Sequence, residues 1–79
     1  MTRPLTLGVA VKYARTSRTS LSARAASIAA GLSESYVGKV EAGSIEPSFR
    51  AFAKIARIVK ITPAEVDLLL RLEADDRGE

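Results

Sequence analysis

Apolar residues recur every three or four positions in several short stretches of the chain, which is the spacing of one helix face. The first stretch runs from about Thr6 to Thr16, and its apolar face consists of Leu7, Val11 and Ala14. The sequence TSRTS follows, and its hydroxyl side chains compete for backbone hydrogen bonds, so it predicts the end of this helix. No stretch shows sustained strand alternation or a hairpin dipeptide. The pattern therefore predicts an all-α chain.

Two further helices are predicted on either side of Gly31. The earlier one opens at Ser22, a favourable N-cap residue, and stops at Gly31, which suits the left-handed position after a helix. The later one opens at Ser33 and stops before Gly43. About three linking residues are too few to reverse two packed antiparallel helices. They predict instead a helix-turn-helix, with a crossing angle of roughly 90–120°.

The residues of this helix pair divide into an inner and an outer set. Ser27 is small, which allows two helices to approach closely, while Val37 and Val40 point into the core at helical spacing. The outer set consists of polar residues and one glycine: Glu34, Ser35, Gly38 and Lys39. These residues form the candidate recognition surface.

The remaining sequence predicts two more helices. Ser48 follows Pro47 and caps the fourth, whose apolar side is expected to contain Phe49, Phe52, Ala53, Ala56 and Val59. The opposite side carries Arg50, Lys54 and Arg57, interpreted mainly as a solvated face. Thr62, Pro63 and Glu65 form a capping-box signal for the fifth helix. The prediction is one domain over residues 1–79, with a core at about 6–72 and an acidic end at 73–79 that frays.

Composition limits the classes of function. Seventy-nine residues suit a single small domain, and 47% hydrophobic with 27% charged residues is typical of a globular protein. The chain has no cysteine and no histidine, so the commonest general base and the commonest metal ligands are absent. No metal, cofactor or catalytic residue is expected, and the protein is not expected to be an enzyme. The apolar runs are too short to span a membrane and no signal peptide is evident, so a cytoplasmic location is expected.

Charge is unevenly distributed along the chain. Residues 1–60 hold ten Lys and Arg against three acids, which gives +7, and residues 61–79 hold two against six, which gives −4. The two parts sum to the net charge of +3. A basic body favours a polyanionic partner on one face, although small domains also carry such unevenness by chance.

The stretch LSARAASIAAGLSESYVGKVEAG and the later PSFRAFAKIARIVKITPAEV resemble the Cro and phage-repressor type helix-turn-helix family, often called XRE. The similarity needs no gap from Leu21 to Val66, and it extends over roughly Leu7 to Leu70 with one extra residue after the first helix. Its most characteristic pieces are the sequences EAG at 41–43 and PS at 47–48. The resemblance implies a compact, five-helix, lambda-repressor-like domain in which helices 2 and 3 form the helix-turn-helix and helix 3 enters the major groove.

The resemblance also implies roles for individual residues. The expected contacts to DNA bases are Ser33, Glu34, Ser35 and Lys39. The expected contacts to the DNA backbone are Arg18, Arg24, Tyr36, Ser44 and Arg50. Arg15 and Glu41 match a structural salt bridge between the first and third helices, and the dimer interface on the fifth helix would use Leu68, Leu69 and Leu72. The chain differs from the family at Ala23, where glutamine is usual, and in the loop at 44–46, which is often basic.

The chain contains no asparagine and no glutamine, the side chains that usually read adenine. Lys39 can donate to guanine O6 and N7, Glu34 can accept from cytosine N4, and Ser35 can serve either base. The contacted bases are therefore expected to be biased towards G·C pairs. The alternatives are purely structural roles. Lys39 would be a solvated surface lysine, Glu34 would stabilise a helix N-terminus, and the first helix would bury all the leucines of the fifth.

The overall prediction is a sequence-specific, double-stranded DNA-binding transcriptional regulator. It is expected to be repressor-like and autoregulatory, and to bind its operator as a homodimer. The alternative is a protein–protein interaction module, such as an antitoxin that binds a partner protein through the fifth helix.

Overall fold

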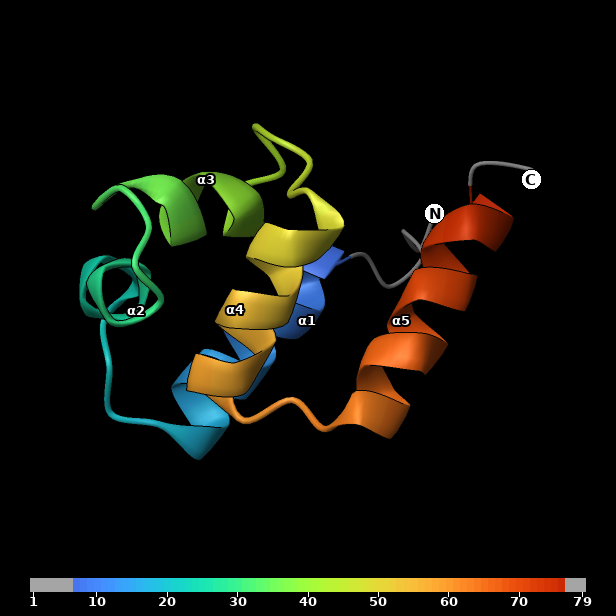
Figure 1. The fold of residues 1–79 in the computed structure, drawn as a ribbon, viewed down its shortest axis with the longest axis horizontal. Helices are drawn as coiled ribbons and strands as arrows, with labels where there is room; N and C mark the ends of the chain where they lie inside the picture. The colour runs from blue at the N-terminus through green and yellow to red at the C-terminus, as the bar shows by residue number, and fades with distance from the viewer. Residues whose placement is uncertain (1–6, 77–79) are drawn as a thin grey trace.

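The computed structural model describes residues 7–76, and the side chains of residues 7–72. Five helices follow one another: α1 (Leu7–Arg18), α2 (Ala23–Ala29), α3 (Tyr36–Glu41), α4 (Phe49–Val59) and α5 (Pro63–Asp76). No strand occurs within this part of the chain, so the all-α prediction is confirmed. In Figure 1, α2 and α3 lie at one side of the molecule, α4 crosses in front of α1, and α5 stands at the other side. Over residues 7–76 no helix is both long and apolar enough to cross a membrane.

Helix α1 is the element on which the core is assembled, because it packs against α3, α4 and α5. Its predicted apolar face is correct, since Leu7, Val11 and Ala14 are all buried. The other helices contribute Ala26, Val37, Val40, Phe52, Ile55, Ala56, Val59 and Leu69 to the same cluster. Burial of each larger apolar side chain contributes roughly 1.5–3 kcal/mol to folding. The core therefore draws on all five helices.

The buried face of α4 differs from the predicted one. The core stripe is Phe52, Ile55, Ala56 and Val59, which follows the spacing i, i+3, i+4 and i+7. Ile55 was missing from the predicted face, while Phe49 and Ala53 were wrongly included in it. Both of these side chains are exposed, Phe49 to 68%, because they lie at the edge of the stripe beside a groove shared with α5.

The end of α1 also differs from the prediction, because the helix continues through Thr16 to Arg18. The hydroxyl of Thr16 donates to the carbonyl of Lys12, and that of Ser17 donates to the carbonyl of Tyr13. These bonds lie along the helix wall and leave its backbone hydrogen bonds in place. The hydroxyl-rich sequence therefore ends the helix two residues later than expected.

Three helices end in the same way. A residue with positive φ follows α2, α3 and α4 within two positions, at Gly31 (74°), Gly43 (76°) and Lys60 (67°). In each case the N–H of the next residue donates to the carbonyl five positions earlier, at 2.8 to 2.9 Å. This bond closes the helix and satisfies a carbonyl that would otherwise lack a partner. The prediction for Gly31 is confirmed, and Lys60 takes a conformation that usually favours glycine.

The start of α5 has the predicted capping box. The backbone N–H of Thr62 donates to Glu65 Oε1 at 2.9 Å, and the N–H of Glu65 donates to Thr62 Oγ1 at 3.2 Å. Arg18 donates to both carboxylate oxygens of Glu65 and to the carbonyl of Lys60, at 2.8 to 2.9 Å. The Arg18 guanidinium and then the Thr62 N–H lower the pKa of Glu65 to about 2. These bonds tie the end of α1 to the start of α5.

Helix α5 continues through the acidic end as far as Asp76. Residues 73–76 of the acidic end are thus helical, and residues 77–79 lie outside the described residues.

Gly8 marks the closest approach of α1 to α3. It is buried, and a Cβ added there would overlap the carbonyl oxygen of Val40 and lie 3.2 Å from that of Glu41. Gly38 is the opposite case, since a Cβ on this α3 residue would have no neighbour within 4 Å. The two glycines form a matched pair for a stability test.

Gly8→Ala should lower the free energy of unfolding by roughly 1–3 kcal/mol, because α1 must shift away from α3. This loss opposes the gain of up to about 1 kcal/mol that alanine brings to a helix interior. Urea unfolding followed by circular dichroism measures the difference. Gly38→Ala is the control, and it should leave stability unchanged or raised. A Gly8→Ala variant as stable as the unaltered protein would contradict the packing described.

Candidate nucleic-acid interface

The helix-turn-helix consists of α2, a link over residues 30–35, and α3. This link is longer than the three residues predicted, because α3 begins at Tyr36 and not at Ser33. The carbonyl of Ser33 accepts from the N–H of Tyr36 at 3.0 Å, which closes a turn ahead of the helix. Ser35 is the N-cap residue, but its side chain makes no capping hydrogen bond. The free backbone N–H groups in the first turn of α3 therefore need an acceptor from elsewhere in the protein.

Ser27 of α2 supplies that interaction. Ser27 is fully buried, with 0% exposure. The hydroxyl oxygen accepts from the N–H of Val37 at 3.0 Å and donates to the carbonyl of Ala23 at 2.9 Å. The N–H of Val37 lies in the first turn of α3, where helix carbonyls cannot accept it. The sequence showed only that residue 27 had to be small, and the contact between helices was not predicted.

The other end of α3 is held by the ion pair that the family resemblance implies. Arg15 Nε lies 2.7 Å from Glu41 Oε2, and its Nη2 lies 3.0 Å from Oε1, so the pair is bidentate. Arg15 Nη1 also donates to the carbonyl of Leu21 at 3.0 Å. The side chains are 14% and 8% exposed, and the bond to Glu41 raises the pKa of Arg15. Arg15 thus joins α1, the segment before α2, and α3.

The four residues predicted to contact bases all lie on the open side of this motif. Ser33, Glu34, Ser35 and Lys39 are exposed, while Val37 and Val40 of the same helix are buried. Figure 1 shows α3 at the periphery of the molecule, with no helix drawn over its outer side. The tertiary structure therefore brings the predicted base contacts together on one accessible surface, here called the reading surface.

The predicted DNA-backbone contacts separate into two groups. Arg24, Ser44 and Arg50 are exposed, and Tyr36 is half-buried against the core. Arg18 is bound by Glu65 and by the Lys60 carbonyl at the ends of α1 and α4, which lie away from α3 in Figure 1. These bonds give Arg18 a structural role between α1 and α5.

Two of the predicted DNA contacts bind each other. Arg24 Nη2 lies 3.1 Å from Glu34 Oε1, and the two side chains are 69% and 64% exposed. Ten residues separate them in sequence, and the turn between α2 and α3 brings them together. One ion pair therefore joins Arg24 of α2 to Glu34 of the reading surface.

The comparison with protein families identifies this arrangement. Residues 6–69 match a family model described as a helix-turn-helix domain. The chain belongs to this family. The match confirms the resemblance inferred from the sequence and indicates a DNA partner. Comparisons with curated proteins and with solved structures give no significant match.

The leucines of α5 play different parts in this helix-turn-helix domain. Leu69 is only 8% exposed and belongs to the core cluster, so it has little surface left for the dimer contact predicted for it. Leu68 and Leu72 are 56% and 37% exposed. The reason is rotation about the helix axis, because Leu69 faces α1 while its neighbour Leu68 turns outward. Val9 and Tyr13 of α1 add further exposed apolar surface, at 51% and 66%.

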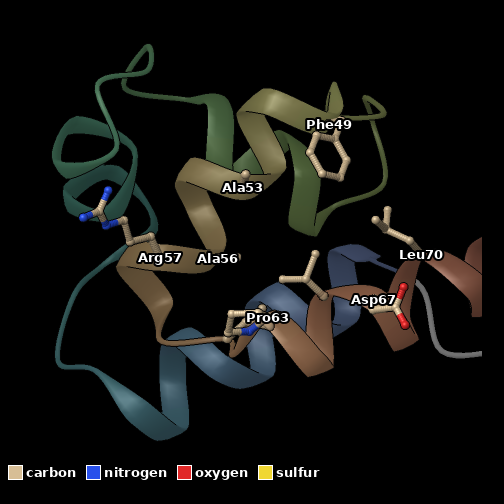
Figure 2. A pocket seen from close by; sticks show the side chains of 9 residues that line it. Phe49, Ala53, Ala56, Arg57, Pro63, Asp67 and Leu70 are labelled. Atoms are coloured by element: carbon tan, nitrogen blue, oxygen red, sulfur yellow. The ribbon is translucent and has the colours of Figure 1, made fainter.

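A second apolar surface lies between α4 and α5. It is a groove of about 480 Å³, lined chiefly by Phe49, Ala53 and Ala56 from α4 and by Pro63, Val66 and Leu70 from α5. Figure 2 shows the Phe49 ring at one end of this α4–α5 groove, with Leu70 of α5 on the other side of the groove at the same end. Arg57 and Asp67 are the charged residues of its lining. Within the described residues no group of three or more acidic side chains could hold a metal ion.

Ser27→Ala tests whether α2 caps α3. It leaves the buried N–H of Val37 without an acceptor, which should cost roughly 1–3 kcal/mol of unfolding free energy. Chemical unfolding measures the loss, and amide hydrogen exchange at Val37 should become faster. Ser17→Ala is the matched control, because that hydroxyl is exposed and bonds only along its own helix, so stability should change by less than about 0.5 kcal/mol. Unchanged protection of Val37 in Ser27→Ala would refute this role.

Proposed function

We propose that the protein is a sequence-specific, double-stranded DNA-binding transcriptional regulator that acts in the cytoplasm as a homodimer. The observation that supports this is the reading surface, where Glu34, Ser35 and Lys39 are exposed. They lie in or just before α3, which is bonded to α2 at its start and to α1 at its end. A dimer bound over a promoter blocks polymerase sterically, so the proposed control is repressor-like, including repression of its own gene. No catalytic role is proposed.

The chemistry of the reading surface suits G·C pairs in the major groove. Lys39 would donate to guanine O6 and N7, and Glu34 would accept from cytosine N4. Ser33 and Ser35 can donate or accept, which lets them adapt to either base. Arg24, Tyr36, Ser44 and Arg50 would bind phosphates around them and so fix the orientation of α3.

A homodimer would let two reading surfaces occupy successive turns of the DNA, with half-sites roughly 34–36 Å apart. Leu68 and Leu72 are separated by one helical turn on α5 and are both exposed, which makes them candidates for a self-complementary contact. Tyr13 of α1 lines the same shallow cavity as Leu68 and would extend this apolar surface.

The α4–α5 groove supports a second candidate function, a protein-interaction module of the antitoxin kind. Phe49 is an aromatic side chain with 68% exposure at the edge of an apolar groove, and such aromatic residues often anchor protein interfaces. In this function the helix-turn-helix is retained as a scaffold, and α4 and α5 bind a different protein.

Selection of binding sites from a random duplex pool tests DNA recognition. Fluorescence anisotropy at about 0.15 M salt should show the selected duplex bound about a thousandfold or more tightly than a scrambled one. The contacted positions should be G·C pairs, and Lys39→Ala should remove most of the preference. Lys54→Ala is the control, since this exposed lysine lies on α4, and it should leave the preference intact. Equal, weak binding to both duplexes would reject the function, and A·T pairs at contacted positions would reject the residue roles.

The dimer contact can be tested by placing a charge on each apolar surface in turn. Leu68→Asp or Leu72→Asp should convert the dimer to monomer in sedimentation equilibrium, because a carboxylate would be desolvated in the contact. Phe49→Asp places the same charge in the α4–α5 groove and should leave the dimer intact. Dissociation by Phe49→Asp alone would move the contact to the groove, and circular dichroism checks that each variant is folded.

A further inference from the structure

The ion pair between Arg24 and Glu34 lies where the reading surface would meet DNA. Arg24 is the second residue of α2, and Glu34 precedes α3 in the turn. A single contact of 3.1 Å joins Arg24 Nη2 to Glu34 Oε1. The pair therefore brings together one group suited to phosphate and one suited to a base edge.

The pair is weakly held in the free protein. Both side chains are about two-thirds exposed, at 69% and 64%, and exposed ion pairs of this kind contribute little to stability. A guanidinium has five N–H donors, and only one of its nitrogens bonds Glu34. This differs from the bidentate and largely buried pair of Arg15 with Glu41. Arg24 and Glu34 can therefore change partners without a change in the fold.

DNA offers each of the two groups a competing partner. A phosphate accepts from arginine in the bidentate geometry that the single contact to Glu34 lacks. The Glu34 carboxylate is repelled by the DNA phosphates. It also loses its hydration when it lies against a base edge, which is unfavourable unless a hydrogen-bond donor on the base replaces the lost water. The cytosine N4 amine is such a donor. The adenine amine lies beside the acceptor N7, which repels the second carboxylate oxygen.

We propose that Arg24 and Glu34 exchange partners only on a site that presents cytosine to Glu34. On such a site Glu34 accepts from cytosine N4, and Arg24 is released to bind a phosphate. On other DNA the two side chains stay paired, so Arg24 neutralises no phosphate. This inference rests on the proposed function of DNA reading and adds to it a coupling between base choice and phosphate binding.

The exchange has a consequence that a merely structural ion pair lacks. Each phosphate neutralised by the protein adds about 0.9 to the slope of log affinity against log salt concentration. The slope should therefore be steeper on the cytosine site than on a matched site without that cytosine, by roughly 1 per protomer. Glu34 would then contribute to specificity because it keeps the Arg24 guanidinium away from phosphate on sites without the cytosine.

The experiment uses the full chain and a duplex selected from a random pool. Each C·G pair of the half-site is replaced in turn by T·A, and binding is measured by anisotropy from about 50 to 200 mM NaCl. For the unaltered protein, one replacement should lower affinity roughly tenfold or more and also flatten the slope by about 1 per protomer. Glu34→Ala frees Arg24, so both effects should disappear at that position, and the replaced duplex should be bound more tightly than before.

Arg24→Gln and Arg50→Gln complete the test. Arg24→Gln should flatten the salt slope on the cytosine duplex by about 1 per protomer and leave the slope on the replaced duplex nearly unchanged. Arg50→Gln, at the exposed start of α4, should weaken binding to both duplexes equally.

Three results would overturn the exchange. The first is an unaltered protein that prefers the selected duplex but shows equal slopes on all replacements. The second is a Glu34→Ala variant that keeps both the base preference and the difference in slope. Either result would leave the proposed function standing. The third, an unaltered protein with no preference for any selected duplex, would overturn the exchange and the proposed function together.

Discussion

The hydrogen bond from the Val37 N–H to the Ser27 hydroxyl is the interaction on which the geometry of the motif depends. Helix α3 has only six residues, and helices shorter than about 12–15 residues are marginal by themselves in water. Its own N-cap residue makes no side-chain bond, so the N–H of Val37 in the first turn finds its acceptor on α2. This bond gives the Val37 N–H an acceptor and links α3 to α2. It therefore also fixes the direction in which the outer side of α3 faces.

The opposite end of α3 is fixed by different physical means. The bidentate pair of Arg15 with Glu41 is largely shielded from water, and the close approach at Gly8 lets the backbone of α1 lie against the last turn of α3. Val37 and Val40 anchor the middle of the helix in the core. The side chains that would meet DNA take no part in these restraints. Recognition residues on the outer side can therefore vary without much effect on the fold.

Helix α5 is attached mainly through α1, which leaves apolar surface on both of its sides. Leu69 faces inward, while the ion pair of Asp67 with Arg71 is well exposed and spaced at i, i+4. Leu68 and Leu72 lie to one side of this pair, and the α4–α5 groove lies to the other. One two-fold contact covers one self-complementary surface, so a homodimer through the leucines would leave the groove accessible. A leucine-mediated homodimer and a partner bound in the groove are therefore sterically compatible.

The sequence by itself determined the features that depend on neighbouring residues. The caps at Ser22 and Ser48, the capping box of Thr62 with Glu65, and the left-handed end at Gly31 are local hydrogen-bonding patterns, and all four occur as predicted. Helical spacing likewise identified the buried face of α1 and the exposed residues of the reading surface. The tertiary structure decided the features that depend on contacts between distant segments. Among them are the hydrogen bond of Ser27 to α3 and the ion pairs of Arg18 with Glu65 and of Arg24 with Glu34. The exposure of Phe49 and the burial of Leu69 belong to the same class. Periodicity places a side chain on a face of its helix, but only the packing of the other helices determines whether that face is covered and which distant group meets it.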